Sequence, residues 1–343
     1  MPRIVVFHEP GPPDVLRVED RPVRRPGAGE VLLAIDAIGL NRAEIAFRQG
    51  RYLEIPEVFP ATLGLEAAGT ILEVGPGVEG FETGEPVATL PVFSMRDYGV
   101  YGDSVVVPAA ALARYPARLS PIEAASVWMS GLTAYGGLVY FGKLGAGNFV
   151  VVTAASSSVG IAAIQIAKWL SARVIAVTRT ARKKPLLTAA GADFVIVSGE
   201  ENLVTRVEEI TAGAGVDVVF DAVGGGMVAR LAKVANLGAR IILYGTLSTE
   251  LTVFPLLTAL QKCLTVHAYR ILSMRRFPGE LENAHRFLFD RLSEGSMTAV
   301  VDRTFPLEDV ADAHRYLESN EQFGKVVLTT GKAMEEFGRA AGV

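Results

Sequence analysis

Small residues fill the segment 154–160, which lies between the apolar run 149–153 and a helical pattern at 159–170. In a parallel sheet, such a turn from strand to helix presents backbone N–H groups to the anionic oxygens of a diphosphate. Against the pattern G-x-G-x-x-G, the segment retains one of the three glycines, Gly160. Its strand and helix context favours a dinucleotide site over a turn that serves packing alone. The residues expected to face the pyrophosphate are Ser156, Ser157, Ser158 and Val159.

A hydroxyl and two basic side chains follow the next apolar run, at Thr178, Arg179 and Lys183. NAD-dependent enzymes place an acidic residue at this strand end to bind the ribose diol, and an acid would repel a 2′-phosphate. A guanidinium beside a hydroxyl binds that phosphate instead. Basic residues at a helix start oppose the helix dipole, so a purely structural role has no electrostatic support. The sequence therefore predicts that NADPH is preferred to NADH.

The pattern of apolar runs predicts an α/β chain of two domains. Between residues 149 and 268, six all-apolar strands alternate with helical patterns, as in a doubly wound parallel sheet covered on both faces. The first 120 or so residues instead carry short β-branched runs separated by Gly and Pro, which indicates a β-rich domain. The C-terminal part contains too few strands for a sheet of its own. We therefore predict a first domain of residues 1–122 and 271–343, with 123–270 inserted as the dinucleotide-binding domain.

Composition and charge exclude several classes of protein. The chain has 343 residues, a net charge of −4 and 50% hydrophobic residues, which is ordinary globular usage. A pI near 5.7 argues against nucleic acid as a partner, because phosphate binding needs concentrated positive charge. The long uncharged stretch 144–167 contains too many polar residues for a membrane span. A lone cysteine, Cys263, and the lack of a signal-peptide core near Met1 predict a cytoplasmic location.

Motifs along nearly the whole chain resemble those of a known family. They stand at residues 39–42, 64–69, 74–78, 128–134, 154–160, 191–193, 221–225 and 323–327. In this order they resemble the medium-chain dehydrogenase/reductase superfamily, and within it the zinc-independent quinone oxidoreductase branch. The resemblance implies a GroES-like catalytic domain formed by both ends of the chain, a central Rossmann domain and, often, a homodimer built through the last Rossmann strand.

The sequence departs from the zinc enzymes of this superfamily at the metal ligands. Those enzymes carry Gly-His-Glu where this chain has Gly64-Leu65-Glu66, and a cysteine near the segment 41–44 where this chain has none. A tetrahedral catalytic zinc needs three N, S or O ligands from the protein. We therefore predict no metal, and a buried, hydrogen-bonded carboxylate at Glu66. Arg42 and Glu44 are equally compatible with an ordinary surface pair, so no chemistry is assigned to them.

The resemblance also implies roles for further residues. Asn41 and Tyr52 would line the cleft near the nicotinamide, and Thr133 would lie near its ring. Tyr52 is the preferred proton donor, with water as the alternative. Residues at strand ends would approach the cofactor, namely Val223, Tyr244, Gly245 and Tyr269, although aromatic residues such as Tyr244 and Tyr269 commonly only cover the core there. Asn320 and Lys325 lie in a segment that returns over the cofactor, and for these two a structural role is equally compatible.

These features predict an NADPH-dependent oxidoreductase that transfers hydride to a quinone or an α,β-unsaturated carbonyl without zinc. Such an acceptor is already electrophilic, so the protein mainly supplies orientation and hydrogen bonds. Two alternatives stay open: an alcohol or aldehyde dehydrogenase of the same superfamily, and a non-catalytic NADPH-binding protein. The expected partner is a small-molecule acceptor, with neither nucleic acid nor membrane involved.

Overall fold

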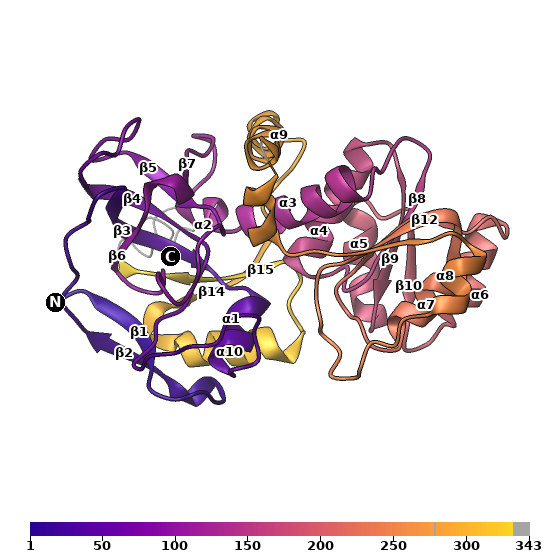
Figure 1. The fold of residues 1–343 in the computed structure, drawn as a ribbon, viewed down its shortest axis with the longest axis horizontal. Coiled ribbons are helices and arrows are strands. Elements are labelled where there is room, and N and C mark those ends of the chain that lie inside the picture. Colours follow the sequence, from indigo (N-terminus) through magenta and orange to yellow (C-terminus); the bar gives the residue numbers. More distant parts are fainter. Residues whose placement is uncertain (278, 332–343) are drawn as a thin grey trace. The chain divides into compact units, whose positions relative to one another are not determined.

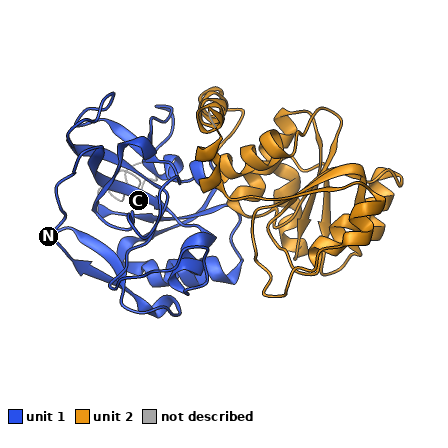
Figure 2. Cartoon of the chain, in the orientation of Figure 1, with its two compact units in different colours: residues 1–129, 299–343 blue, residues 130–298 orange. Residues whose placement is uncertain are grey.

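The computed structural model describes residues 1–277 and 279–331, and it divides the chain into two compact units (Figure 2). Unit 1 combines residues 1–129 with the C-terminal segment from 299, and unit 2 holds residues 130–298. Both ends of the chain therefore build one unit, as predicted. The boundaries lie at 129/130 and 298/299, whereas the sequence analysis placed them at 122/123 and 270/271.

Unit 2 is built on a six-stranded sheet in which every neighbouring pair is parallel (Figure 1). Its strand order is β10-β9-β8-β11-β12-β13, which is the doubly wound order with β8 as the first strand. The central strands are buried on both faces, which explains their near-continuous apolar sequences. The strands are β8 (Phe149–Val152), β9 (Arg173–Thr178), β10 (Phe194–Val197), β11 (Val216–Asp221), β12 (Ala235–Leu243) and β13 (Thr265–Ala268).

Helices connect these strands and close the unit. They are α3 (Trp128–Tyr135), α4 (Ser158–Trp169), α5 (Lys184–Ala189), α6 (Leu203–Thr211), α7 (Met227–Val234), α8 (Leu256–Gln261) and α9 (Glu280–Glu294). Helix α9 lies in the segment 271–343, which the sequence analysis assigned to the other domain. Its apolar face holds Ala284, Leu288 and Leu292, and its Phe287 ring packs against Tyr135 and Trp169 of this unit. This packing places the helix in unit 2.

Unit 1 contains a seven-stranded sheet and a two-stranded sheet. The small sheet pairs β1 (Arg3–Phe7) with β2 (Leu16–Asp20). The large sheet has the order β14-β15-β3-β4-β5-β7, with β6 also paired to β3. Its strands are β3 (Glu30–Gly39), β4 (Ala67–Val74), β5 (Pro86–Thr89), β6 (Ser104–Pro108), β7 (Leu112–Ala113), β14 (Val301–Pro306) and β15 (Lys325–Thr329).

The C-terminal strand β15 lies inside this sheet, parallel to β14 and antiparallel to β3. All of its residues are buried, from Lys325 to Thr329. The helices of unit 1 are α1 (Arg42–Arg48), α2 (Pro121–Ala124) and α10 (Val310–Ser319). Residues far apart in sequence are therefore neighbours in this sheet, because β15 pairs with β3. Among the described residues no helix is long and apolar enough to cross a membrane.

Candidate functional site

The loop between β8 and α4 has the geometry that a diphosphate site requires. Ser157 is the N-cap of α4, and its hydroxyl accepts a hydrogen bond from the Gly160 N–H at 3.1 Å. A side chain at Gly160 would bring a Cβ within 2.5 Å of the Ala155 carbonyl oxygen, so glycine is needed at this position. The loop therefore retains the one glycine that its backbone demands, and small residues elsewhere keep its surface open to a ligand.

Lys183 connects this loop to the end of β9. Its side chain is mostly buried, and its ammonium donates to the Ser156 hydroxyl at 3.0 Å. Thr178, the last residue of β9, is also buried, whereas Arg179 directly after it is exposed. Two cationic side chains, Arg179 and Lys183, therefore follow the end of β9, and that of Lys183 is bonded to the loop between β8 and α4. Such an arrangement supplies positive charge beside a diphosphate site.

The carboxyl ends of β11 and β12 carry a further group of predicted cofactor residues. Asp221 is fully buried and accepts hydrogen bonds from Thr153 Oγ1 at 2.5 Å and from the Val223 N–H at 3.1 Å. Burial raises the pKa of the Asp221 carboxyl. The Tyr244 ring stacks on Phe220 with its centroid 4.0 Å away, and burial raises the pKa of its hydroxyl above the ordinary range. Tyr244 is therefore a neutral phenol that packs as part of the sheet end.

Two other predicted residues of this unit have structural contacts. The Tyr269 hydroxyl donates to the Leu132 carbonyl at 3.2 Å, so this ring closes against α3. Gly245 lies against the end of β11, because an added Cβ would be 2.8 Å from the Ala222 carbonyl oxygen. Thr133 is buried on α3.

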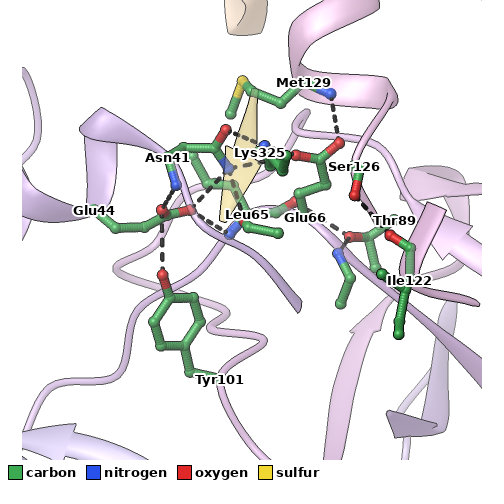
Figure 3. A network of polar contacts seen from close by, with 12 residues as sticks. Asn41, Glu44, Leu65, Glu66, Thr89, Tyr101, Ile122, Ser126, Met129 and Lys325 are labelled. Atoms are coloured by element: carbon green, nitrogen blue, oxygen red, sulfur yellow. Dashed lines mark hydrogen bonds and ion pairs between the residues drawn. The ribbon is translucent and has the colours of Figure 1, made fainter. Parts of the chain in front are cut away.

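A second polar site lies in unit 1, where Asn41, Glu44, Glu66, Tyr101 and Lys325 form what we call the buried polar cluster (Figure 3). The Lys325 ammonium contacts Glu66 Oε2 at 2.5 Å and Asn41 Oδ1 at 2.7 Å. Lys325 is 1% exposed and Glu66 is not exposed at all. The second Glu66 oxygen accepts from the Met129 N–H at 2.9 Å. Glu66 is thus the buried, hydrogen-bonded carboxylate that the sequence predicts.

Glu44 does not form the surface pair with Arg42 that the sequence left open. Its carboxylate is fully buried and accepts from the Leu65 N–H at 3.2 Å and from the Tyr101 hydroxyl at 3.3 Å. Glu44 also forms a capping box with Asn41 at the start of α1. Arg42 turns away and donates to Leu317 O and to the Asn320 side chain. The sequence could not decide between the two, because a Glu at the third position of a helix can cap a buried helix start as readily as it can form a surface pair.

Burial raises the pKa of Glu44 to about 7, opposed by the charge of Lys325 and by hydrogen bonds from Asn41. Tyr101, also fully buried, has a hydroxyl whose pKa is raised well above its usual value by burial and by Glu44. The cluster therefore holds one carboxylate, Glu66, directly paired with a cation, and a second that titrates near neutral pH.

The structure gathers the predicted site residues into separate groups. Asn41 and Lys325 meet in the buried polar cluster, and Ser156 meets Lys183 at the loop before α4. Tyr52 lies half-buried in the segment between α1 and β4. Ser158 and Val159 begin α4, and Asn320 ends α10 in a left-handed conformation. Glu44 and Tyr101 were missed as members of the cluster, for which the sequence predicted only the buried, hydrogen-bonded carboxylate of Glu66.

The two units and their sites define a two-domain nucleotide-binding dehydrogenase or reductase. Residues 27–117 match the family model described as the alcohol dehydrogenase GroES-like domain, and residues 190–328 match the one described as zinc-binding dehydrogenase. Quinone oxidoreductase 1 of Escherichia coli is 32% identical, over 94% of this chain and 98% of its own length. A 2-haloacrylate reductase from a Burkholderia species is 30% identical, over 94% of this chain and 97% of its own.

Solved structures agree with these matches. The structure of Escherichia coli quinone oxidoreductase complexed with NADPH aligns with a TM-score of 0.89 and 31% identity, over 95% of this chain and 99% of the other. An NAD-dependent alcohol dehydrogenase aligns with a TM-score of 0.87 and 34% identity, over 96% of this chain and 100% of the other. The chain belongs to the medium-chain dehydrogenase/reductase superfamily, in its quinone oxidoreductase branch.

Proposed function

We propose that this protein is an NADPH-dependent reductase of quinones or α,β-unsaturated carbonyl compounds that works without zinc. The observation that carries the proposal is the loop before α4, to which Lys183 is bonded through Ser156, together with the exposed Arg179 directly after β9. Relatives of this chain are complexed with NADPH or named as reductases of quinone and haloacrylate. When bound, NADPH supplies a hydride, and a conjugated acceptor takes it without a Lewis acid.

The buried polar cluster argues against zinc. The donors expected of a zinc site are replaced by Leu65, whose side chain has no ligand atom, and by the Asn41 amide. An ammonium, that of Lys325, stands between Asn41 and Glu66, and its charge repels a second cation. Within residues 1–277 and 279–331, no three His, Cys, Asp or Glu side chains are grouped as metal ligands are. The residues present therefore do not fit a catalytic zinc.

In this proposal the chain's own residues bind the cofactor and orient the acceptor. Asn41, Tyr52 and Thr133 contribute the contacts at the reacting end, and Tyr52 donates the proton that the reduced acceptor needs. Thr178, Arg179 and Lys183 hold the 2′-phosphate, and the serine loop from Ser156 to Val159 holds the pyrophosphate. The remaining proposed cofactor contacts are Val223, Tyr244, Gly245, Tyr269 and Asn320, and Lys325 acts on the cofactor site through Asn41, to which its ammonium donates.

A turnover assay with metal analysis tests this function. Purified protein with NADPH and a panel of quinones, enones and aldehydes should oxidise NADPH with the conjugated acceptors, without stoichiometric zinc and with activity unchanged by a chelator. Bound zinc that leaves together with activity would favour the alcohol or aldehyde dehydrogenase alternative. Tight NADPH binding without turnover on any acceptor would favour the non-catalytic alternative.

Replacing Tyr52 by Phe should slow acceptor reduction at least tenfold while the Kd for NADPH stays unchanged, because proton donation by a positioned group contributes about 10²–10⁴-fold. Steady-state kinetics with a solvent isotope effect measures the first quantity, and quenching of nicotinamide fluorescence measures the second. An unchanged kcat in the variant would assign the proton to water.

We also propose that the protein is a cytoplasmic homodimer formed through unit 2. Strand β13 is an edge of the parallel sheet, and a bare edge is a template for pairing. Beside it in sequence, α8 and the segment before it expose many large apolar side chains, a feature that marks protein interfaces. These residues are Leu247, Leu251, Val253, Phe254, Leu256, Leu257 and Leu260. A second copy related by a two-fold axis would cover the same patch on both chains.

Leu257 is 76% exposed, and its replacement by Glu should convert the dimer to a monomer in sedimentation velocity. A charge in an apolar interface is left desolvated and unpaired, which costs several kcal/mol. The matched control is Leu186→Glu on α5, an exposed leucine outside the patch, which should leave the dimer intact. A wild-type protein that sediments as a monomer at micromolar concentration would contradict the dimer.

A further inference from the structure

The segment that follows β12 lies along a glycine-rich turn of the same unit. Residues 244–255 contain no helix or strand, and we call them the connecting segment because they join β12 to α8. The turn, residues 222–226, follows β11 and ends in three consecutive glycines. Both stretches leave the carboxyl ends of neighbouring parallel strands, which is the edge of such a sheet where a dinucleotide binds.

Hydrogen bonds hold the connecting segment against the turn. The N–H groups of Leu247 and Ser248 donate to the carbonyl oxygens of Ala222 and Val223 at 3.0 and 2.8 Å. In the opposite direction, the Gly225 N–H donates to Thr252 Oγ1 at 2.8 Å. Gly225 has a φ of +54°, and a Cβ at this position would lie 2.5 Å from Ser248 Oγ. The shape of the turn therefore depends on where the connecting segment lies.

The connecting segment and α8 also carry exposed apolar side chains. Leu251 and Val253 are 91% and 74% exposed, and Leu257 and Leu260 of α8 are 76% and 66% exposed. Because the connecting segment contains no helix or strand, its conformation is held by its bonds to the turn and by whatever covers these side chains. In the homodimer proposed above, a second copy of the chain covers them.

We infer that dimer formation and dinucleotide binding are coupled through the connecting segment, so that each strengthens the other. The inference rests on the proposed function, in which the dinucleotide contacts Val223 and Gly245 and a second copy covers the apolar side chains. Both events need the connecting segment in the same place, so the first to occur loses the conformational entropy of holding it there. The second event then occurs with a smaller entropic loss, and the coupling is the same in either order.

The test compares NADPH binding by the monomer and by the dimer of the unmodified protein. Nicotinamide fluorescence is titrated at protein concentrations below and above the dimer dissociation constant, which sedimentation velocity measures with and without NADPH. We expect the dimer to bind NADPH about tenfold more tightly than the monomer, within the usual range of coupling between sites. Because a dimer has two such sites, saturating NADPH should lower the dimer dissociation constant about a hundredfold.

If the dimer does not dissociate on dilution, two variants supply the monomer. Leu257→Glu and Leu257→Lys should both sediment as monomers and bind NADPH about tenfold more weakly than the wild-type dimer. The two introduced charges have opposite signs, so a direct electrostatic effect on the anionic cofactor would change its affinity in opposite directions. Leu186→Glu on α5 is the control, and it should remain a dimer with wild-type affinity.

A third variant tests the connecting segment itself. Thr252→Val removes the acceptor of the Gly225 N–H, and the gain in NADPH affinity on dimer formation should fall from about tenfold to about threefold or less. The matched control is Thr249→Val. Thr249 is an exposed threonine of the same segment, and the hydrogen bonds described for the turn do not include it. This control should keep the wild-type gain.

The inference is overturned if monomer and dimer bind NADPH equally, or if Thr252→Val and Thr249→Val both keep the wild-type gain. Either result would leave the proposed reductase and the proposed dimer intact. A protein that binds no NADPH, or that stays a monomer at every concentration, would instead refute the proposed function on which the inference rests.

Discussion

Replacing Lys325 by Met is expected to lower the free energy of unfolding by about 3–5 kcal/mol, the cost of removing one partner of a buried ion pair. Lys325 and Glu66 are 1% and 0% exposed, so the Glu66 carboxylate would remain buried without its cation, retaining the hydrogen bond from the Met129 N–H and the Asn41 amide at 3.5 Å. Urea unfolding of the wild type and the variant at pH 8, followed by circular dichroism, measures the difference.

The double variant Lys325→Met with Glu66→Gln separates charge from packing. A neutral pair of similar volume avoids the uncompensated carboxylate, and the amide oxygen introduced by Glu66→Gln could still accept from Met129. We therefore expect the double variant to recover most of the lost stability. If it is no more stable than Lys325→Met alone, the loss comes from packing at β15 and the buried charge is not its cause.

Replacing Arg179 by Ala should weaken NADPH binding by roughly 10- to 150-fold and leave NADH binding almost unchanged. A hydrogen bond to a charged group contributes about 1.5–3 kcal/mol, and this one would be made only to the 2′-phosphate. Arg179 follows β9 directly and is exposed, so its removal leaves no cavity and no unpaired buried group. Fluorescence titration with both cofactors measures the ratio of the two dissociation constants.

Lys184→Ala is the control for net charge. Lys184 is exposed at the start of α5, near Arg179 in sequence, and has no proposed contact with the phosphate. It should change the NADPH to NADH ratio by less than threefold, because an isolated exposed charge contributes little through solvent. The result would contradict a specific role of Arg179 if both variants lost NADPH affinity to a similar extent, or if Arg179→Ala weakened NADPH and NADH equally. The preference for NADPH would then come from the net positive charge of this region.

The strands of unit 2 could be predicted from the sequence because each central strand is buried on both faces and its apolar run ends close to the end of the strand. The serine loop and the basic end of β9 followed from their places after two of those strands. Strand β14 was missed because it exposes residues such as Asp302 and Arg303 at the edge of its sheet. An edge strand in contact with solvent has no continuous apolar run to reveal it.

The buried polar cluster could not be predicted because its partners come from distant parts of the chain. Lys325 and Glu66 are 259 residues apart in sequence, and the resemblance assigned Lys325 to the cofactor rather than to this pair. Glu44 looked like half of a surface pair with Arg42, since spacing alone does not tell whether a helix start is buried. What the sequence did convey was the loss of metal ligands at Leu65 and Asn41.

The position of β15 between β14 and β3 affects how the chain is made. A ribosome makes β3 before unit 2 and β15 after it, so β3 lacks this neighbour during the synthesis of the whole stretch from Gly39 to Lys325. Unit 2 lies wholly within that stretch and can collapse in the meantime. Until residue 325 has been made, Glu66 lacks the Lys325 ammonium, so any product truncated before this residue would keep an open sheet edge and an uncompensated acid, both of which quality-control proteases and chaperones can recognise.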